Sequence, residues 1–313
     1  MVGMLPVFWR VNSWVAESAI GISDVFIDRL TVRNPYFSLK TSISCFFCRL
    51  TIGKKERNVS RIILLVSETY ARDGSHLLEQ DGDAFQILKN CRGYYRCPTD
   101  GNGMPIGPVV GYTKEYEPGK NWVGLEYYDF AMADMWPAVL GYFASRMVQR
   151  LREASLVPDI IIGAPWAGVK FSQEVARQIG CRQIFAEKTG DKYLILGRYE
   201  DAISSGDRVV IGEELVNNAS TTGTLMRLVE RAEGHVIGII CAINRSFPFR
   251  TGFPGSDGEE IPILGVIERE TPQYHQDDPL VAEAIARGCV VWKPKYDWDR
   301  LKIIMGDALP VPR

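Results

Sequence analysis

From about residue 131 onward the chain alternates short apolar stretches with segments of helical periodicity, and this alternation limits the possible folds more than any other feature. The pattern predicts strands at residues 159–162, 183–187, 193–199, 208–211, 235–243 and 263–267, and helices at residues 131–154, 169–180, 222–232 and 280–287. Continuous apolar strands separated by helices are typical of a parallel sheet covered by helices on both faces. We therefore expect an α/β fold whose ligands bind beyond the carboxyl ends of the strands.

Three zones of the 313-residue chain differ in character. Residues 1–60 are aromatic, β-branched and basic without a sustained period, residues 61–155 form an entry region of strand-like segments and one long helix, and residues 156–313 hold the α/β core with a C-terminal segment. No methionine lies between Met4 and Met104. One hypothesis is that the working protein begins near the end of the first zone at a non-Met start codon, and the alternative is a genuine but poorly ordered arm.

Composition and charge exclude several classes of protein. The net charge is −2, so there is no basic field to collect nucleic acid or acidic lipid. No apolar run approaches the roughly 20 residues that a membrane helix needs. The apolar stretch Met1–Trp9 precedes Arg10 instead of following a basic segment, which does not fit a secretory signal. We therefore expect a cytoplasmic protein with no nucleic-acid and no membrane partner.

Seven cysteines spread over the whole chain indicate reduced thiols and not a disulfide framework. Cys45 and Cys48 have the spacing of zinc ligands, and Cys91 and Cys97 could complete a set of four. The sequence contains no second pair with this spacing. We therefore expect buried or unreactive thiols, with a structural zinc as the alternative.

The stretch from Arg208 to Leu225, RVVIGEELVNNASTTGTL, carries the chemistry. It is an apolar strand followed by Glu213 and Glu214, a small polar loop and a helix. Residues 220–224 supply hydroxyls and free N–H groups at a helix N-terminus, where a phosphate is stabilised. Carboxylates at the end of the strand can accept hydrogen bonds from sugar hydroxyls or hold magnesium. A ribose with a 5-phosphate satisfies both halves, and the alternative is a capped helix after an acidic turn.

This stretch resembles the ribose-phosphate signature of type I phosphoribosyltransferases, and the resemblance extends over about residues 156–250. In orotate phosphoribosyltransferases of this family, one further strand ends in an arginine that contacts the base, and an N-terminal hood covers the base. The similar stretches here are the pyrophosphate loop (residues 159–168), the segment with a diphosphate lysine (185–188), the arginine strand (235–245) and the hood (93–95 and 127–130). The resemblance implies a parallel-sheet phosphoribosyltransferase type I core flanked by helices, with an N-terminal hood region.

The same resemblance implies transfer of a phosphoribosyl group from phosphoribosyl pyrophosphate to a nitrogenous base, with Mg²⁺ as cofactor. Glu213 and Glu214 would orient the ribose and hold the metal, and Lys188 would add positive charge at the diphosphate. Arg245 would contact the base, and its guanidinium fork suits an anionic base such as orotate. The ribose 5-phosphate loop would comprise Asn218, Ala219, Ser220, Thr221, Thr222, Gly223 and Thr224. The pyrophosphate loop would comprise Ala164, Pro165, Trp166, Ala167 and Gly168.

Three departures from the family pattern keep other functions open. The acid pair is Glu-Glu where the family commonly has an Asp, the loop at residues 215–220 is longer, and the lysine-rich lid of orotate enzymes is not evident between Lys188 and Gly197. The expected activity is orotate phosphoribosyl transfer in pyrimidine synthesis, giving orotidine monophosphate and pyrophosphate. The alternatives are transfer to a purine or other base, and a non-catalytic regulator that senses ribose phosphate. The resemblance also implies a homodimer.

Overall fold

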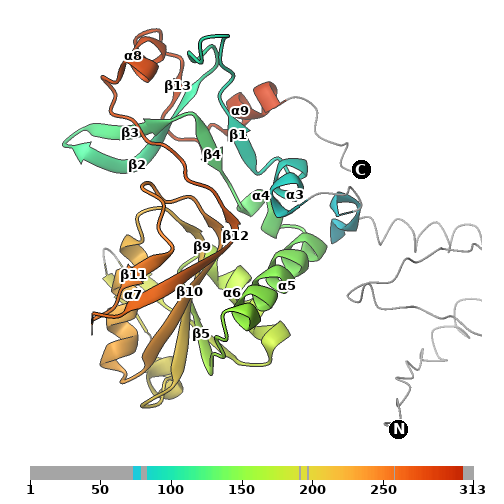
Figure 1. Ribbon diagram of the computed structural model, residues 1–313, viewed down its shortest axis with the longest axis vertical. Coiled ribbons are helices and arrows are strands. Elements are labelled where there is room, and N and C mark those ends of the chain that lie inside the picture. Colours follow the sequence, from blue (N-terminus) through green and yellow to red (C-terminus); the bar gives the residue numbers. More distant parts are fainter. Residues whose placement is uncertain (1–72, 79–82, 190–191, 196, 257, 306–313) are drawn as a thin grey trace, which may run out of the picture. The chain divides into compact units, whose positions relative to one another are not determined.

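The computed structural model in Figure 1 describes residues 73–78, 83–189, 192–195, 197–256 and 258–305. The chain divides into two compact units, Met1–Lys55 and Glu56–Arg313, and all described residues belong to the second unit. The predicted N-terminal extension of residues 1–60, its hypothetical start and the Cys45–Cys48 pair therefore lie outside the described residues.

A six-stranded sheet forms the core of the second unit, in the order β11-β12-β10-β9-β5-β6. Five of its strands run parallel: β5 (Ile160–Gly163), β6 (Arg182–Phe185), β9 (Arg208–Val216), β10 (His235–Asn244) and β12 (Glu260–Glu268). The short strand β11 (Gly252–Pro254) pairs antiparallel with β12 at one edge. The predicted α/β class with a parallel sheet is confirmed.

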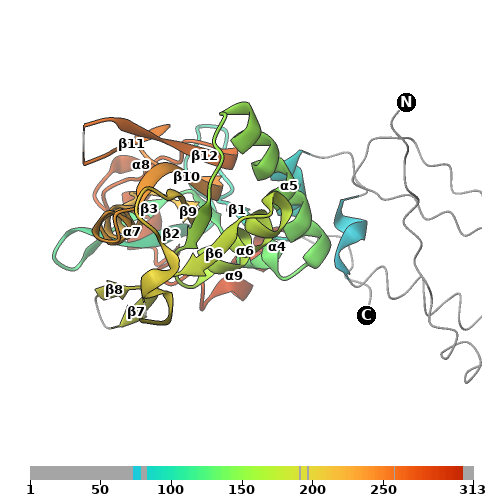
Figure 2. The same ribbon diagram turned by 90° about the horizontal axis from the view of Figure 1, so that it is seen from below.

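Helices cover both faces of this sheet. Figure 1 and Figure 2 both show α7 (Ser220–Arg231) on one side, and α5 (Pro137–Glu153) and α6 (Ala167–Ile179) on the other. Neighbouring residues of β9 enter different cores, since Val210 packs with α5 and α6 whereas Val209 packs with α7. Burial on both faces explains why these strands are apolar throughout and do not alternate with polar residues.

Local chemistry sets where the helices begin and end. The helix predicted at residues 131–154 is in fact two helices, α4 (Ala131–Asp134) and α5, because Pro137 is not tolerated in a helix interior and begins α5 instead. Helix α6 is capped by Gly180 at φ 83°, a left-handed conformation that glycine adopts without strain, so its predicted stop is confirmed. Among the described residues, no helix has both the length and the apolar character that crossing a membrane requires.

Strand β10 carries one extra residue near its start. Val236 pairs with Val209 of β9, but the next residue of β9, Val210, pairs with Gly238. Ile237 therefore forms a bulge. If the pairing continued without this bulge, each side chain from Gly238 onward would face the opposite side of the sheet.

A second group of elements, which we call the hood, consists of two small sheets and the helices packed on them. In one sheet β1 (Tyr94–Arg96) pairs with β4 (Glu126–Tyr128), and in the other β2 (Val109–Glu117) pairs with β3 (Lys120–Gly124) and β13 (Val290–Val291). The helical elements of the hood are α3 (Ala84–Asn90), α8 (Pro279–Ala286) and α9 (Trp298–Met305), with Phe85 of α3 against Tyr94 of β1, α8 on β2 and α9 on β1, whereas η2 (Ser75–Leu77) contacts α5. The C-terminal segment, which the sequence analysis grouped with the core, thus contributes α8, β13 and α9 to the hood, whereas α5, which it grouped with the entry region, packs on the core sheet.

Between β6 and β9 the chain forms a hairpin of β7 (Glu187–Thr189) and β8 (Lys192–Leu194), followed by the 3-10 helix η3 (Gly197–Ala202). The prediction of one extended segment at residues 193–199 is wrong. Strand β8 is held extended by its pairing with β7, and the chain turns into a helix where that pairing ends.

Candidate active site

Strands β5 and β9 lie side by side, and the chain runs from each of them into a helix. Gly163 at the end of β5 pairs with Gly212 of β9, and the Ala164 N–H donates to the Gly212 carbonyl oxygen at 2.8 Å. The predicted pyrophosphate loop, residues 164–168, therefore starts against the strand that carries the acid pair. The N-termini of α6 and α7 follow these strands, and the positive ends of their dipoles favour an anion.

The pyrophosphate loop touches β9 backbone to backbone. A methyl group added at Gly168 would lie 2.6 Å from the Gly212 carbonyl oxygen and 3.1 Å from Cα of Glu213. Only glycine fits such an approach without displacing one of the two segments. The contact places the start of α6 directly beside the first acid of the pair.

Three consecutive N–H groups point out of the start of α6. In the part of the chain that the structure describes, no acceptor lies on the N–H groups of Trp166, Ala167 and Gly168. Trp166 is 72% exposed, and the peptide bond between Pro165 and Trp166 is cis. Adjacent unpaired donors at a helix start can bind the oxygens of a diphosphate.

The start of α7 is partly closed by its own loop. Ala219 has φ 55°, a left-handed conformation that non-glycine residues rarely adopt. Asn218 Oδ1 accepts a hydrogen bond from the Ser220 N–H at 3.3 Å. Within the described residues, the N–H groups of Thr221 and Thr222 meet no acceptor. Two donors therefore remain for a phosphate, and the Asn218 side chain occupies a third.

The two acids are divided between the faces of the sheet. Thr222 Oγ1 donates to Glu213 Oε1 at 3.5 Å, so Glu213 faces α7 and the phosphate loop. Glu214 is the next residue of the strand and faces the other side, where Asp129 and Asp134 act on its ionisation. The sequence interpretation treated the carboxylates as one pair. Of the two, the structure joins Glu213 alone to the described residues of the phosphate loop.

Burial raises the pKa of both carboxyl groups. The pKa of Glu213 rises to about 8, mainly through burial, and the hydrogen bond from Thr222 opposes this rise. The pKa of Glu214 rises to about 7, again through burial, with Lys295 lowering it and Asp129 raising it further. A cation brought into this site would lower both pKa values, so the ligand-free pair is poised to receive positive charge.

Two lysines that the sequence analysis did not single out act on the Glu214 side. Lys170 Nζ lies 2.8 Å from Oδ1 of Asp134, whose side chain is only 3% exposed. Lys295, in the C-terminal segment, lowers the pKa of Glu214 and of Asp129. No local signal marks either lysine, because α6 and the C-terminal segment meet here only through the tertiary fold.

Lys188 is exposed on β7, and its Nζ lies 5.8 Å from the centroid of the Tyr193 ring. No ion pair joins it to either acid among the described residues. The main chain nevertheless brings β7 near the pyrophosphate loop, because the Ala186 N–H donates to the Gly163 carbonyl oxygen at 3.2 Å. Lys188 thus stands beside the start of this loop without contacting the acid pair.

Arg245 is buried where β10 ends, with only 5% of the residue exposed. Its N–H donates to the Val216 carbonyl oxygen at 2.9 Å, and its guanidinium carbon lies 4.3 Å from the centroid of the Tyr112 ring in the hood. Its Nη1 is buried and has no partner in the described part of the chain. A buried, unpaired guanidinium nitrogen is costly unless a ligand supplies an acceptor.

The hood segments that the sequence singled out lie together. Tyr95 pairs with Tyr127 across β1 and β4. Burial raises the pKa of Tyr127, and both Arg245 and Glu214 lie close enough to act on this pKa. Tyr127 therefore connects the arginine side of the site with the acid side. Tyr112, which contacts Arg245, was not predicted, because its partner lies on a strand far away in the sequence.

A metal at this site would need ligands from the substrate. Among the described residues, no three His, Cys, Asp or Glu side chains are grouped so that they could hold an ion. Mg²⁺ commonly binds through one or two carboxylates together with substrate phosphates and water. Glu213 fits that role beside the phosphate loop, whereas Glu214 faces the other side of the sheet. Cys91 and Cys97, the described half of the alternative zinc set, pack in separate cores.

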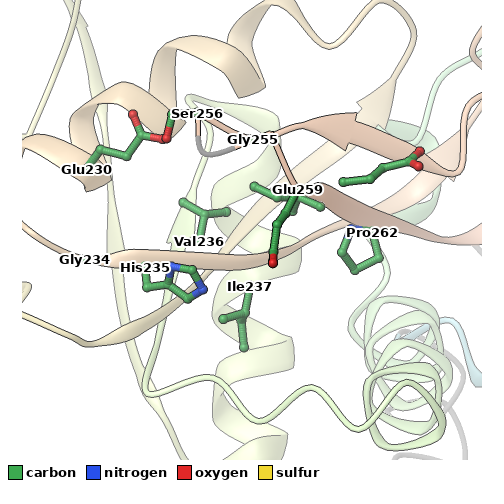
Figure 3. A pocket seen from close by; sticks show the side chains of 11 residues that line it. Glu230, Gly234, His235, Val236, Ile237, Gly255, Ser256, Glu259 and Pro262 are labelled. Carbon is green, nitrogen blue, oxygen red and sulfur yellow. The ribbon is translucent and has the colours of Figure 1, made fainter.

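The cavity in Figure 3 lies away from this site. Its volume is about 220 Å³, and it is lined by the first residues of β10, by the end of α7 and by the β11–β12 connection, including Glu230, His235 and Glu259. These residues lie at the amino ends of β10 and β12. The features of the candidate site described above all lie toward the carboxyl ends.

The chain is similar to several known proteins. No family model matches it. It is 30% identical over 128 residues to the orotate phosphoribosyltransferase of Caldanaerobacter subterraneus subsp. tengcongensis, spanning 41% of this chain and 63% of that relative. It is 31% identical over 152 residues to the orotate phosphoribosyltransferase of Deinococcus radiodurans, spanning 46% of this chain and 77% of the relative.

Two solved structures are similar at lower identity. Adenine phosphoribosyltransferase from Saccharomyces cerevisiae is 17% identical with a TM-score of 0.42, covering 59% of this chain and 98% of that one. UMP synthase from Leishmania donovani is 15% identical with a TM-score of 0.41, covering 79% and 46%. With 31% identity over more than two thirds of the Deinococcus radiodurans relative, the chain belongs to the orotate phosphoribosyltransferase family.

Proposed function

We propose that this chain transfers the phosphoribosyl group of phosphoribosyl pyrophosphate to orotate, giving orotidine monophosphate and pyrophosphate. The observation that carries the proposal is the pairing of Gly163 with Gly212. It sets two helix starts with unpaired N–H groups beside a half-buried carboxylate. Two anionic groups and a sugar between them form the ligand that this arrangement suits.

Different residues would bind different parts of the substrate. The N–H groups of Thr221 and Thr222 would bind the 5-phosphate, and those of residues 166–168 would bind the diphosphate. Glu213, which already accepts a hydrogen bond from Thr222 at the phosphate loop, would accept hydrogen bonds from the ribose hydroxyls. Lys188 would approach the diphosphate from β7, and Lys170 and Lys295 add positive charge on the Glu214 side.

In the reaction, the bond from carbon 1 of the ribose to the diphosphate oxygen breaks, and a bond from this carbon to a base nitrogen forms. The base nitrogen releases its proton to solvent, and the diphosphate leaves with the electron pair of the broken bond. Carbon 1 gains cationic character, which the nearby carboxylates stabilise, while the helix starts stabilise the leaving anion. When bound, Mg²⁺ would neutralise charge on the diphosphate, held by the substrate together with Glu213, the acid that faces the phosphate loop.

Orotate is favoured over a purine by the surroundings of Arg245. Its guanidinium is buried, is held against Tyr112 and keeps an unpaired Nη1. A carboxylate on the base would give this nitrogen a charged acceptor, and charge-assisted hydrogen bonds of this kind are the strong ones. Adenine and other neutral purines carry no such group.

The test is an assay of pyrophosphate release with phosphoribosyl pyrophosphate, Mg²⁺ and either orotate, uracil or adenine. We expect release with orotate alone. Glu213→Ala should abolish release, whereas Glu283→Ala, an exposed acid on α8 paired with Arg287, should not change it. Release with adenine alone would select the purine activity, and ligand binding without release would select a regulator. Wild-type activity in Glu213→Ala would refute the site.

Three further properties belong to the proposal. We infer that the protein acts with Mg²⁺, as a homodimer and in the cytoplasm, each supported by the family to which the chain belongs. We also propose the domain division into an extension of residues 1–60, a hood from residues 61–155 and a core from residues 156–313, whose C-terminal segment returns to the hood. Sedimentation in the presence and absence of Mg²⁺ and substrate measures the oligomeric state directly.

A further inference from the structure

After β12 the chain crosses from the core sheet to the hood as an irregular segment, residues 269–278, which we call the strap. Figure 1 shows it running from the end of β12 past β9 toward β3 and α8. At its core end the Arg269 N–H donates to the Asn244 carbonyl oxygen at 2.9 Å. The strap therefore begins beside Asn244, the residue that precedes Arg245.

The far end of the strap is fixed to the hood. Tyr274 exchanges two backbone hydrogen bonds with Val123, of 2.8 and 3.0 Å. The ring of His275 stacks on Tyr116, with centroids 4.0 Å apart and planes within 5°. Gln276 Nε2 donates to the Asn121 carbonyl oxygen at 3.0 Å. These contacts hold the strap on β2 and β3 independently of the core.

One strap side chain reaches the phosphate loop. Gln273 Nε2 donates to Asn217 Oδ1 at 2.7 Å. Asn217 is the first residue after β9, so it opens the loop that leads to α7. The residue before it, Val216, gives its carbonyl oxygen to the Arg245 N–H. The loop entrance is thus tied to the base-side arginine by one bond and to the hood by another.

The loop needs such support because of its conformation. Ala219, two residues after Asn217, is held in the left-handed region at φ 55°. A non-glycine residue stays in this region only when its surroundings determine it. The Ser220 N–H bonded to Asn218 holds the loop from the helix side, and Gln273 holds it from the hood side.

We propose that Gln273 is a positioning residue that holds the phosphate loop in place through its hydrogen bond to Asn217. Binding of the 5-phosphate is thereby linked to the hood. The inference rests on the proposed function and adds a residue to it. Gln273 touches neither the reacting atoms nor the acids among the described residues. Its effect should therefore appear in the affinity for the phosphorylated ribose and not in the rate of the bound complex.

The experiment measures binding of ribose 5-phosphate by calorimetry and steady-state kinetics with phosphoribosyl pyrophosphate and orotate. For Gln273→Ala we expect the Kd of ribose 5-phosphate and the KM of phosphoribosyl pyrophosphate to rise roughly threefold to tenfold, the range for loss of one neutral hydrogen bond. The kcat and the KM of orotate should stay within about twofold. Asn217→Ala removes the same bond from the other side, and the double variant should lose no more than either single one.

Gln276→Ala is the matched control, because it removes a strap contact with Asn121 and does not touch the phosphate loop. We expect it to leave the Kd of ribose 5-phosphate unchanged. Equal binding by wild type and Gln273→Ala would overturn the inference and leave the proposed function standing. Equal weakening by Gln273→Ala and Gln276→Ala would also overturn it. A wild-type protein that binds no ribose 5-phosphate would overturn both.

Discussion

Adding a single methyl group at Gly168 should impair catalysis strongly while the protein still folds. In Gly168→Ala the new carbon would lie 2.6 Å from the Gly212 carbonyl oxygen, about 0.8 Å closer than the 3.4 Å at which ordinary contact begins. Neither neighbour is a flexible side chain, since both close contacts are main-chain atoms of β9. The pyrophosphate loop must therefore move away from the strand by a large part of that distance.

The size of the effect follows from this overlap. Overpacking of a buried contact costs about 1–3 kcal/mol. For a protein of this size, each kcal/mol lowers Tm by roughly 2–4 °C, so we expect a decrease of about 2–12 °C. A displacement approaching 1 Å in a substrate-positioning group costs roughly 100-fold in rate. We therefore expect kcat/KM for phosphoribosyl pyrophosphate to fall by about 10- to 100-fold in molecules that remain folded.

The assay pairs thermal unfolding with pyrophosphate release at a temperature well below both transitions. Gly101→Ala is the control, because nothing lies within 4 Å of a methyl group at that position. It should change neither Tm nor kcat/KM. If Gly168→Ala retained kcat/KM within twofold and melted with wild type, the loop could not lie against β9 as described, and the assignment of residues 164–168 to the diphosphate would fail.

Three other variants test separate parts of the site. Arg245→Gln should raise the KM of orotate roughly 10- to 100-fold, which is the range for loss of a charged hydrogen bond. The Kd of ribose 5-phosphate should stay unchanged. Loss of ribose 5-phosphate binding would contradict a role of Arg245 on the base side. Glu213→Gln tests ionisation. The pKa of Glu213 is raised to about 8, so the folded protein keeps a proton that the unfolded chain releases near pH 4.5, and the stability of the ligand-free protein falls as pH rises between these values. The variant should melt with wild type near pH 4.5 and about 2–8 °C above it at pH 9, after discounting for partial exposure; equal melting at pH 9 would show that this carboxyl ionises normally. Lys188→Ala should lower kcat for pyrophosphate release without changing the Kd of ribose 5-phosphate, and an unchanged kcat would remove Lys188 from the diphosphate site.

Much of the core could be predicted because its signals are local. The apolar runs of β5, β9 and β10 and the stop at Gly180 follow from burial and from glycine's conformational freedom. Strand β9 is longer than predicted, because its apolar run ends at Ile211 while its pairing with β10 continues to Val216. That continuation depends on a neighbouring strand, which a local pattern does not contain.

The hood was less predictable for the same reason. Val290 pairs with Val109, and this contact joins two segments that lie far apart in the sequence. Likewise Arg245 could be named from a resemblance, but its stacking on Tyr112 joins the end of β10 to β2. The placement of Glu213 and Glu214 on opposite faces could have been predicted from the sequence, because adjacent residues of a strand point to opposite sides.

The extra residue at Ile237 has an effect at the other end of its strand. Side chains of a strand alternate, so an insertion near the start reverses the facing of all that follow. If Ile237 paired with Val210 and no bulge formed, each residue from Gly238 onward would pair one position further along β9 and would face the wrong side of the sheet. The sequence in that register would retain every motif, yet Arg245 would follow a strand end whose side chains face the opposite side from the one that brings it to Tyr112.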